Sequence, residues 1–186
     1  MNNINNKFKL LCGILSFLLL AACAASPPPP PQYTYGRDAI KIHIKADPEL
    51  NQYNGSPHTL LLCVQQLSNP NTFSQLSGDM AGIYKLLGCS RYDSTVTNSR
   101  RIIVQPGQVA EYSLDRAENT KYVSVATGYY NVQKENVVRL IKIPVVVKTK
   151  GVFSRTRTSE PAILNLELDL GPSGPLEIKN IAGGHQ

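Results

Sequence analysis

Four cysteines and three histidines are among the side chains of this chain that could act as nucleophiles, metal ligands or redox groups. The histidines are His43, His58 and His185, and they stand far apart in the sequence. None belongs to a local metal-ligand pattern such as H-x-x-E-H, and the sequence holds no G-x-x-x-x-G-K phosphate loop. A Ser-His-Asp triad could still assemble in space, because triads need no sequence proximity. With no motif in its favour, we expect no catalytic residue, no metal site and no cofactor.

Cys23 stands where a bacterial lipoprotein carries its lipid. A polar start with two lysines and no acid is followed by an apolar run over residues 10–20. This run is shorter than the roughly 20 residues of a membrane-spanning helix, but it suits a signal peptide. It ends in Leu20-Ala21-Ala22-Cys23, the pattern of a lipobox. We therefore expect residues 1–22 to be a lipoprotein signal peptide and Cys23 to be acylated. A chance cysteine in an apolar segment is the alternative.

The residues after Cys23 predict a spacer between lipid and domain. Ala24 stands where inner-membrane lipoproteins of many Gram-negative bacteria have Asp. We therefore expect the lipid to lie in the outer membrane and the domain to lie in the periplasm. Several acyl chains on one cysteine would anchor the protein stably to that membrane. Residues 26–31 read SPPPPP, which favours an extended polyproline II segment. Residues 23–36 are thus predicted to be a lipidated, proline-rich tether.

Cys63 and Cys89 remain as one pair, because Cys12 is removed with the signal peptide and Cys23 carries the lipid. An oxidising compartment favours a disulfide between them. In the chain-entropy model this bridge would contribute about 3–4 kcal/mol to stability. Two buried free thiols are the alternative, whereas a zinc site would need neighbouring histidines that the sequence lacks.

Alternation of apolar and polar residues predicts an all-β domain. Residues 39–46 (AIKIHIKA) alternate strictly, which is typical of a half-buried strand. Further strands are expected over residues 59–67, 101–105, 109–114, 122–130, 136–148 and 162–170. Pro144 indicates an edge, a bulge or a break in one of them. Short strands with polar turns indicate a two-sheet β-sandwich over residues 37–170, followed by a flexible tail over residues 171–186.

One segment, residues 71–88, has helical periodicity with a single apolar stripe. Asp79 is expected to cap the start of its last helix, and Gly88 is expected to end that helix. The segment follows the second strand, so it predicts a short helical insertion that returns Cys89 towards Cys63.

A long loop is expected between the first two strands, over residues 47–58 (DPELNQYNGSPH). Leu50 and Tyr53 offer apolar anchors for a partner, flanked by Asn51, Gln52 and Asn54. Long loops on rigid sandwiches often carry function, although a tolerated insertion fits the composition equally well.

A basic cluster of Lys148, Lys150, Arg155 and Arg157 surrounds Gly151. It suits anionic lipid headgroups or an acidic partner, with a solvated hairpin tip as the alternative. For the whole chain, 19 Lys and Arg against 13 Asp and Glu give a formal net charge of +6 without a long basic block. This balance argues against nucleic acid as a partner.

Four segments together resemble the TssJ family, the outer-membrane lipoproteins of bacterial type VI secretion systems. They are LLLCVQQLSNPNTFSQL (residues 60–76), YKLLGCSRYD (84–93), VQPGQ (104–108) and YVSVATGYYNVQKENVVRLIKIPV (122–145). The resemblance implies a transthyretin-like β-sandwich with a short helical insertion after the second strand and a protruding loop between the first two strands.

The resemblance also implies a structural role without catalysis. The lipid on Cys23 would hold the protein in the outer membrane, and the domain would bind the periplasmic part of TssM, with TssL as an indirect partner. The family's partner-contacting loop corresponds here to residues 47–58, with Leu50, Asn51, Gln52, Tyr53 and Asn54 as the candidate contacts. The alternatives are another periplasm-facing binding lipoprotein, either a secretin pilot or a small-ligand carrier. A carrier would need a deep apolar pocket.

Overall fold

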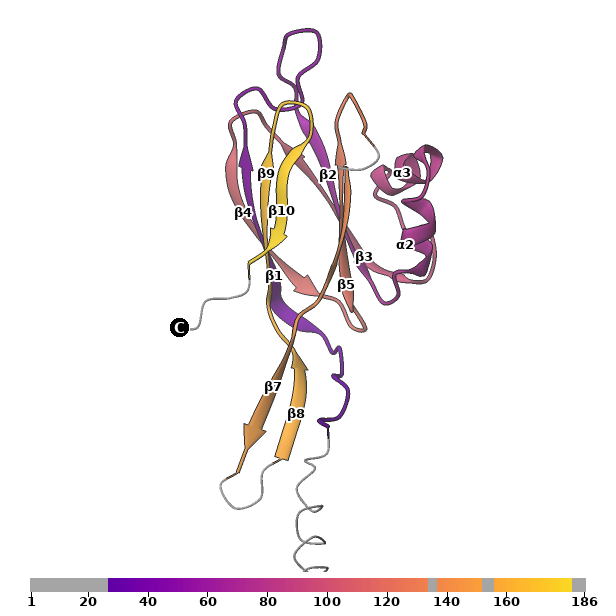
Figure 1. The fold of residues 1–186 in the computed structure, drawn as a ribbon, viewed down its shortest axis with the longest axis vertical. Coiled ribbons are helices and arrows are strands. Elements are labelled where there is room, and N and C mark those ends of the chain that lie inside the picture. The colour runs from indigo at the N-terminus through magenta and orange to yellow at the C-terminus, as the bar shows by residue number, and fades with distance from the viewer. Residues whose placement is uncertain (1–26, 134–136, 152–155, 182–186) are drawn as a thin grey trace, which may run out of the picture.

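A computed structural model describes residues 27–133, 137–151 and 156–181 of the chain. Two four-stranded sheets face each other as a β-sandwich, and a two-stranded ribbon extends from one end (Figure 1). The strands are β1 (Gly36–Ala46), β2 (Leu60–Leu67), β3 (Val96–Val104), β4 (Val109–Arg116), β5 (Tyr122–Gly128), β6 (Val138–Lys142), β7 (Val145–Lys150), β8 (Thr156–Pro161), β9 (Leu164–Leu170) and β10 (Pro175–Asn180). The helices are α2 (Asn71–Leu76) and α3 (Met80–Leu87).

The first sheet has the order β10-β9-β1-β4, and inward-facing and outward-facing residues alternate along its two central strands. Every second residue of β1 points into the core, with Ile40, Ile42 and Ile44 buried and the intervening side chains facing outward. β9 runs parallel to β1 and sets a leucine beside each of these isoleucines, from Leu164 onward. The predicted two-sheet sandwich with its half-buried first strand is therefore confirmed.

The second sheet has the order β3-β2-β5-β6, and its central strands are covered on both faces. One face of β2 and β5 packs on the first sheet, and α2 and α3 cover the other face (Figure 1). Phe73, Ile83 and Leu86 of the helices are buried in this second layer. This double coverage explains why nearly every residue of β2 is buried.

The predicted helical insertion is present as the two short helices α2 and α3. Asp79 caps α3, since its carboxylate accepts a hydrogen bond of 2.7 Å from the backbone N–H of Gly82, and Gly88 follows the last turn. A side chain at position 82 would clash with α2, because an added Cβ would lie 2.0 Å from the carbonyl oxygen of Leu76. Gly82 thus allows the two short helices to pack closely.

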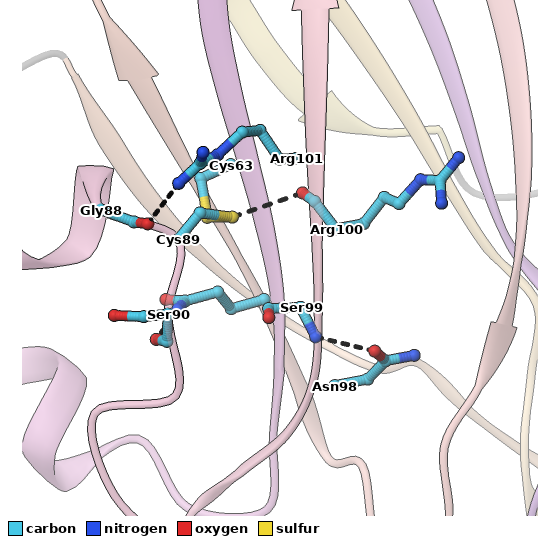
Figure 2. The surroundings of a disulfide bond; sticks show 9 residues. Cys63, Gly88, Cys89, Ser90, Asn98, Ser99, Arg100 and Arg101 are labelled. Carbon is cyan, nitrogen blue, oxygen red and sulfur yellow. Dashed lines mark hydrogen bonds between the residues drawn. A yellow bond between two sulfur atoms is a disulfide. The ribbon is translucent and has the colours of Figure 1, made fainter.

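The disulfide Cys63–Cys89 joins this insertion to the sheet, as the sequence predicted (Figure 2). Cys63 lies in the centre of β2, and Cys89 follows α3 with a backbone φ of +53°. Beside the bridge, the guanidinium of Arg101 on β3 donates a hydrogen bond of 2.6 Å to the carbonyl of Gly88. The end of α3 is therefore tied both to β2 and to β3.

Two parts of the chain differ from the sequence prediction. The stretch 136–148 is not one strand, because Pro144 breaks it into β6 in the sandwich and β7 in the ribbon. The tail after residue 170 was predicted to be flexible, which is wrong for Pro175–Asn180. Residues 171–174 form a tight turn closed by the N–H of Gly171 and the carbonyl of Gly174, and the following residues pair with β9 as β10.

The connections give the sandwich two distinct ends (Figure 1). The tether enters β1 at the end where the β7–β8 ribbon extends, which we call the tether end. The β1–β2 loop and the β9–β10 turn lie at the opposite end, which we call the loop end. A partner at the loop end would thus meet the molecule on the side away from its tether.

Candidate partner-binding site at the loop end

The β1–β2 loop, residues 47–59, protrudes from the loop end but is firmly held at its base (Figure 1). The N–H of Asp47 donates to the carbonyl of Leu170 at 2.8 Å, and the N–H of Gln52 donates to the carbonyl of Pro172 at 2.7 Å. On the other side, the N–H of His58 donates to the carbonyl of Leu50 at 2.9 Å. Because its backbone donors are paired in this way, the loop presents a defined surface.

Leu50 and Asn51 support the loop from below. Leu50 has no exposed surface, and Asn51 is 2 % exposed. The amide of Asn51 donates to the carbonyl of Thr59 at 2.8 Å and accepts from the N–H of Tyr130 at 2.8 Å. The sequence prediction treated both residues as partner contacts, and their burial assigns them instead to holding the β1–β2 loop against the segment after β5.

Gln52, Tyr53 and Asn54 are exposed, as a contact surface requires. The backbones of Tyr53 and Ser56 exchange hydrogen bonds of 2.9 and 3.1 Å and close a tight turn. Asn54 and Gly55 fill the turn with φ angles of +50° and +75°, values that Asn and Gly adopt most readily. The asparagine- and glycine-rich composition of the loop thus holds Tyr53 at the tip.

Three aromatic rings gather at the surface of the loop end, and we call them the aromatic cluster: Tyr53, His58 and Tyr130. Tyr53 stacks on Tyr130 with a centroid distance of 4.7 Å and an interplanar angle of 15°. The ring of His58 meets Tyr130 edge-on at 4.9 Å. Tyr53 and Tyr130 remain 50 % and 56 % exposed, so the stacked pair offers an apolar surface with hydroxyls to a partner.

The sequence analysis did not single out Tyr130 as a candidate contact. The structure buries Tyr129 to 3 % exposure and turns Tyr130 outward, as alternation along an extended chain requires. Burial raises the pKa of the Tyr129 phenol well above its ordinary value. The doubled tyrosine directly after a buried strand was the signal that one ring faces solvent.

The remaining chemistry-bearing side chains do not converge. His43 lies on the outer face of β1, 3.9 Å from a carboxylate oxygen of Glu111, and His185 lies outside the described residues. No group of three His, Cys, Asp or Glu side chains within the described residues could hold a metal ion.

A partly open groove of about 560 Å³ lies between the edges of β3 and β4, lined mainly by polar and charged side chains such as Arg37, Arg100 and Asp115. It is unlike the deep apolar pocket that a small-ligand carrier would need.

At the tether end, the described part of the predicted basic cluster lies on the β7–β8 ribbon, with Lys148 and Lys150 on β7 and Arg157 on β8. Arg155, Cys23 and the predicted signal peptide lie outside the described residues. No helix among the residues that the structure describes has the length and apolar character to cross a membrane.

Solved structures with the same fold come from type VI secretion systems. The T6SS lipoprotein TssJ1 from Pseudomonas aeruginosa shares 17% sequence identity and a TM-score of 0.54, with 83% of this chain and 100% of that chain covered. Serratia marcescens Lip, described as a membrane bound component of the type VI secretion system, shares 17% identity and a TM-score of 0.52, with 77% of this chain and 96% of that chain covered.

A chain of the structure described as the T6SS protein TssM C-terminal domain (869–1107) from EAEC shares 14% identity and a TM-score of 0.52, with 77% of this chain and 98% of that chain covered. No curated protein sequence matches the chain significantly. The family model T6SS-SciN, described as type VI secretion lipoprotein, VasD, EvfM and TssJ, matches residues 38–158, which is well over half of the chain. This protein therefore belongs to the TssJ family of type VI secretion lipoproteins, membrane-associated structural components with a β-sandwich fold.

Proposed function

We propose that this protein is the outer-membrane lipoprotein of a type VI secretion system and that its loop end holds the periplasmic domain of TssM. The observation that carries the proposal is the separation of the two ends: the tether leaves one end of the sandwich and the aromatic cluster lies at the other (Figure 1). A domain acylated at Cys23 would then direct Tyr53 and Tyr130 away from the outer membrane. That is the direction from which an inner-membrane protein approaches.

The architecture suits an anchor that resists mechanical force and carries out no chemistry. Acyl chains on Cys23 would resist extraction from the membrane, and the Cys63–Cys89 bridge limits the compliance of the sandwich. Family membership supports a structural role, so we propose no catalytic activity. TssL would be linked only indirectly, through TssM.

The aromatic cluster is suited to carry much of the binding energy. Tyrosines are enriched among the few interface residues that dominate affinity, because they bury a large area and lose little side-chain entropy. The fixed base of the β1–β2 loop holds Tyr53 in place before binding, which lowers the entropic cost of association.

Binding of the purified TssM periplasmic domain to the mature protein tests the proposal. We expect Tyr53→Ala to weaken binding by about 2 kcal/mol, roughly 30-fold, as measured by isothermal titration calorimetry. Tyr84→Ala is the matched control, because Tyr84 is 60 % exposed on α3 and is not part of the aromatic cluster. Equal affinities for the wild type and both variants would refute the loop assignment, and the absence of any binding would refute TssM as the partner.

A further inference from the structure

Strand β7 of the β7–β8 ribbon is the most exposed regular element of the described chain, and the proposed TssM contact does not use the ribbon. All six residues of β7 are exposed, and the ribbon pairs with no strand of either sandwich sheet. Val145, Val146 and Val147 are 38 %, 43 % and 54 % exposed. An isolated two-stranded ribbon is at best marginally stable in water, so three uncovered valines on one such ribbon point to a second surface that covers them.

The charge of the ribbon is positive and concentrated towards its free end. Its described residues carry Lys148, Lys150 and Arg157 against a single acid, Glu160. The ammonium group of Lys148 lies 2.5 Å from a carboxylate oxygen of Glu160, nearer the base. Lys150 and Arg157, the charges furthest from the sandwich, form no ion pair among the described residues. The end of the ribbon is thus suited to an anionic surface.

The strand register shows which side chains share a face. Lys150 lies opposite Thr156 and on the same face as Val146, whereas Arg157 lies opposite Thr149 and shares the other face with Val147. Both faces therefore combine an apolar residue near the base with a cation near the tip. Headgroups that surround the length of the ribbon would contact the cations and the valines of both faces, which a one-sided protein interface would not.

The base of the ribbon is fixed to the point where the tether enters the domain. Arg116 is only 5 % exposed, and its guanidinium donates to the carbonyl of Thr34 at 3.2 Å and to the carbonyl of Ala162 at 3.5 Å. Thr34 belongs to the tether, and Ala162 directly follows β8. The N–H of Ala162 also donates to the carbonyl of Pro144 at 2.8 Å and closes the base of the ribbon. Ribbon and tether are thereby held side by side at one end of the molecule (Figure 1).

The lengths allow the lipid and the ribbon to reach one membrane together. Six residues of extended strand span about 20 Å. The residues from Cys23 to Gly36 would span about 40 Å in an extended polyproline-like conformation. Because the tether has the longer reach, acylation does not hold the ribbon away from the bilayer.

We propose that the β7–β8 ribbon is a second membrane contact, which binds the anionic phospholipid surface beside the acylated Cys23 through Lys150, Arg157 and the exposed valines. This inference rests on the proposed lipid anchor. The ribbon orients the sandwich with its loop end away from the bilayer, so that the tether alone does not have to set the orientation.

The test places a polarity-sensitive fluorophore on an unnatural amino acid in place of Thr149 in the full mature lipoprotein. The protein is reconstituted into vesicles of phosphatidylethanolamine with phosphatidylglycerol, or of phosphatidylcholine alone. We expect the emission of the fluorophore to shift to shorter wavelength only in the vesicles that contain phosphatidylglycerol. In the Lys150→Gln/Arg157→Gln variant the equilibrium constant for contact between the ribbon and these vesicles should fall about 30-fold, since each cation near an anionic surface contributes about fivefold.

Lys45→Gln/Lys85→Gln is the matched control, because it removes the same charge from exposed positions on β1 and α3 and should keep the blue shift. A fluorophore that stays in water while the protein floats with the vesicles would overturn the ribbon contact and leave the lipid anchor intact. A shift that appears only when a protein partner is added, without lipid, would overturn it in favour of a protein interface. A protein that carries no acyl chain and does not float would contradict the proposed function itself.

Discussion

At the scale of single residues, Asn51 shapes the candidate binding site without being exposed in it. Its side chain joins the β1–β2 loop to the N–H of Tyr130 and so holds the two stacked rings together. Asn51→Ala would leave this N–H and the carbonyl of Thr59 without their partners. We expect it to lower the free energy of unfolding by about 2–4 kcal/mol, measured by chemical denaturation.

Asn54→Ala is the control for backbone strain, because Asn54 has nearly the same φ as Asn51, +50° against +51°, but is exposed. It should cost only about 1 kcal/mol, the price of a left-handed conformation for alanine. Equal losses in the two variants would show that the hydrogen bonds of Asn51 contribute nothing beyond its conformation.

Tyr92 predicts a loss of stability at alkaline pH. Burial, and to a lesser extent the charge of Asp93, raises the pKa of the Tyr92 phenol from 10.0 to about 12. The folded state thus prefers the neutral phenol, so this contribution is fully present below pH 10 and is lost as the pH rises through about 12. Between these values, unfolding titrations should show a steeper loss for the wild type than for Tyr92→Phe.

At neutral pH the Tyr92→Phe variant should be at least as stable as the wild type, because the buried hydroxyl of Tyr92 has no hydrogen-bond partner among the residues that the structure describes. Parallel pH dependences of the two proteins would contradict the assignment of this titration to Tyr92.

At the scale of elements, the disulfide adds a covalent link to the packing that holds the helical insertion on the sheet. The bridge fixes the end of α3 to the centre of β2 across a sequence separation of 26 residues. We expect Cys63→Ala/Cys89→Ala to lower the free energy of unfolding by about 3–4 kcal/mol in denaturant titrations. Reduced wild-type protein should match the variant, and an unchanged midpoint in both would show that packing alone holds the insertion.

The elements also show what a sequence can reveal. β1 and β9 were predictable because one face of each is buried, which imposes strict alternation. Pro144 indicated an edge, a bulge or a break in the strand over residues 136–148. The sequence did not indicate that β6 pairs within the sandwich while β7 pairs with β8, because strand pairing depends on residues far apart in the chain. β10 was missed since its residues are mostly exposed and show little alternation.

The candidate site was predictable only in part for the same reason. The composition of residues 47–58 indicated a loop, and Tyr53 at its tip was correctly expected to be exposed. The burial of Leu50 and Asn51 and the pairing of Tyr53 with Tyr130 depend on contacts between segments far apart in the sequence. Periodicity within one segment carries no information about such contacts.

At the scale of the whole molecule, the sandwich is a rigid spacer with different chemistry at its two ends. The tether end carries the basic ribbon, and the loop end carries the aromatic cluster (Figure 1). The disulfide ties the helical insertion to β2, and the buried Arg116 ties the tether to the domain. Many copies in one assembly would add avidity to a modest single contact.

Photocrosslinking in cells tests this polarity most directly. A benzophenone amino acid is placed in place of Tyr53 or, in a separate strain, in place of Thr149 on the ribbon. The account predicts that position 53 crosslinks to TssM and that position 149 does not. A crosslink to TssM from position 149 with none from position 53 would contradict it.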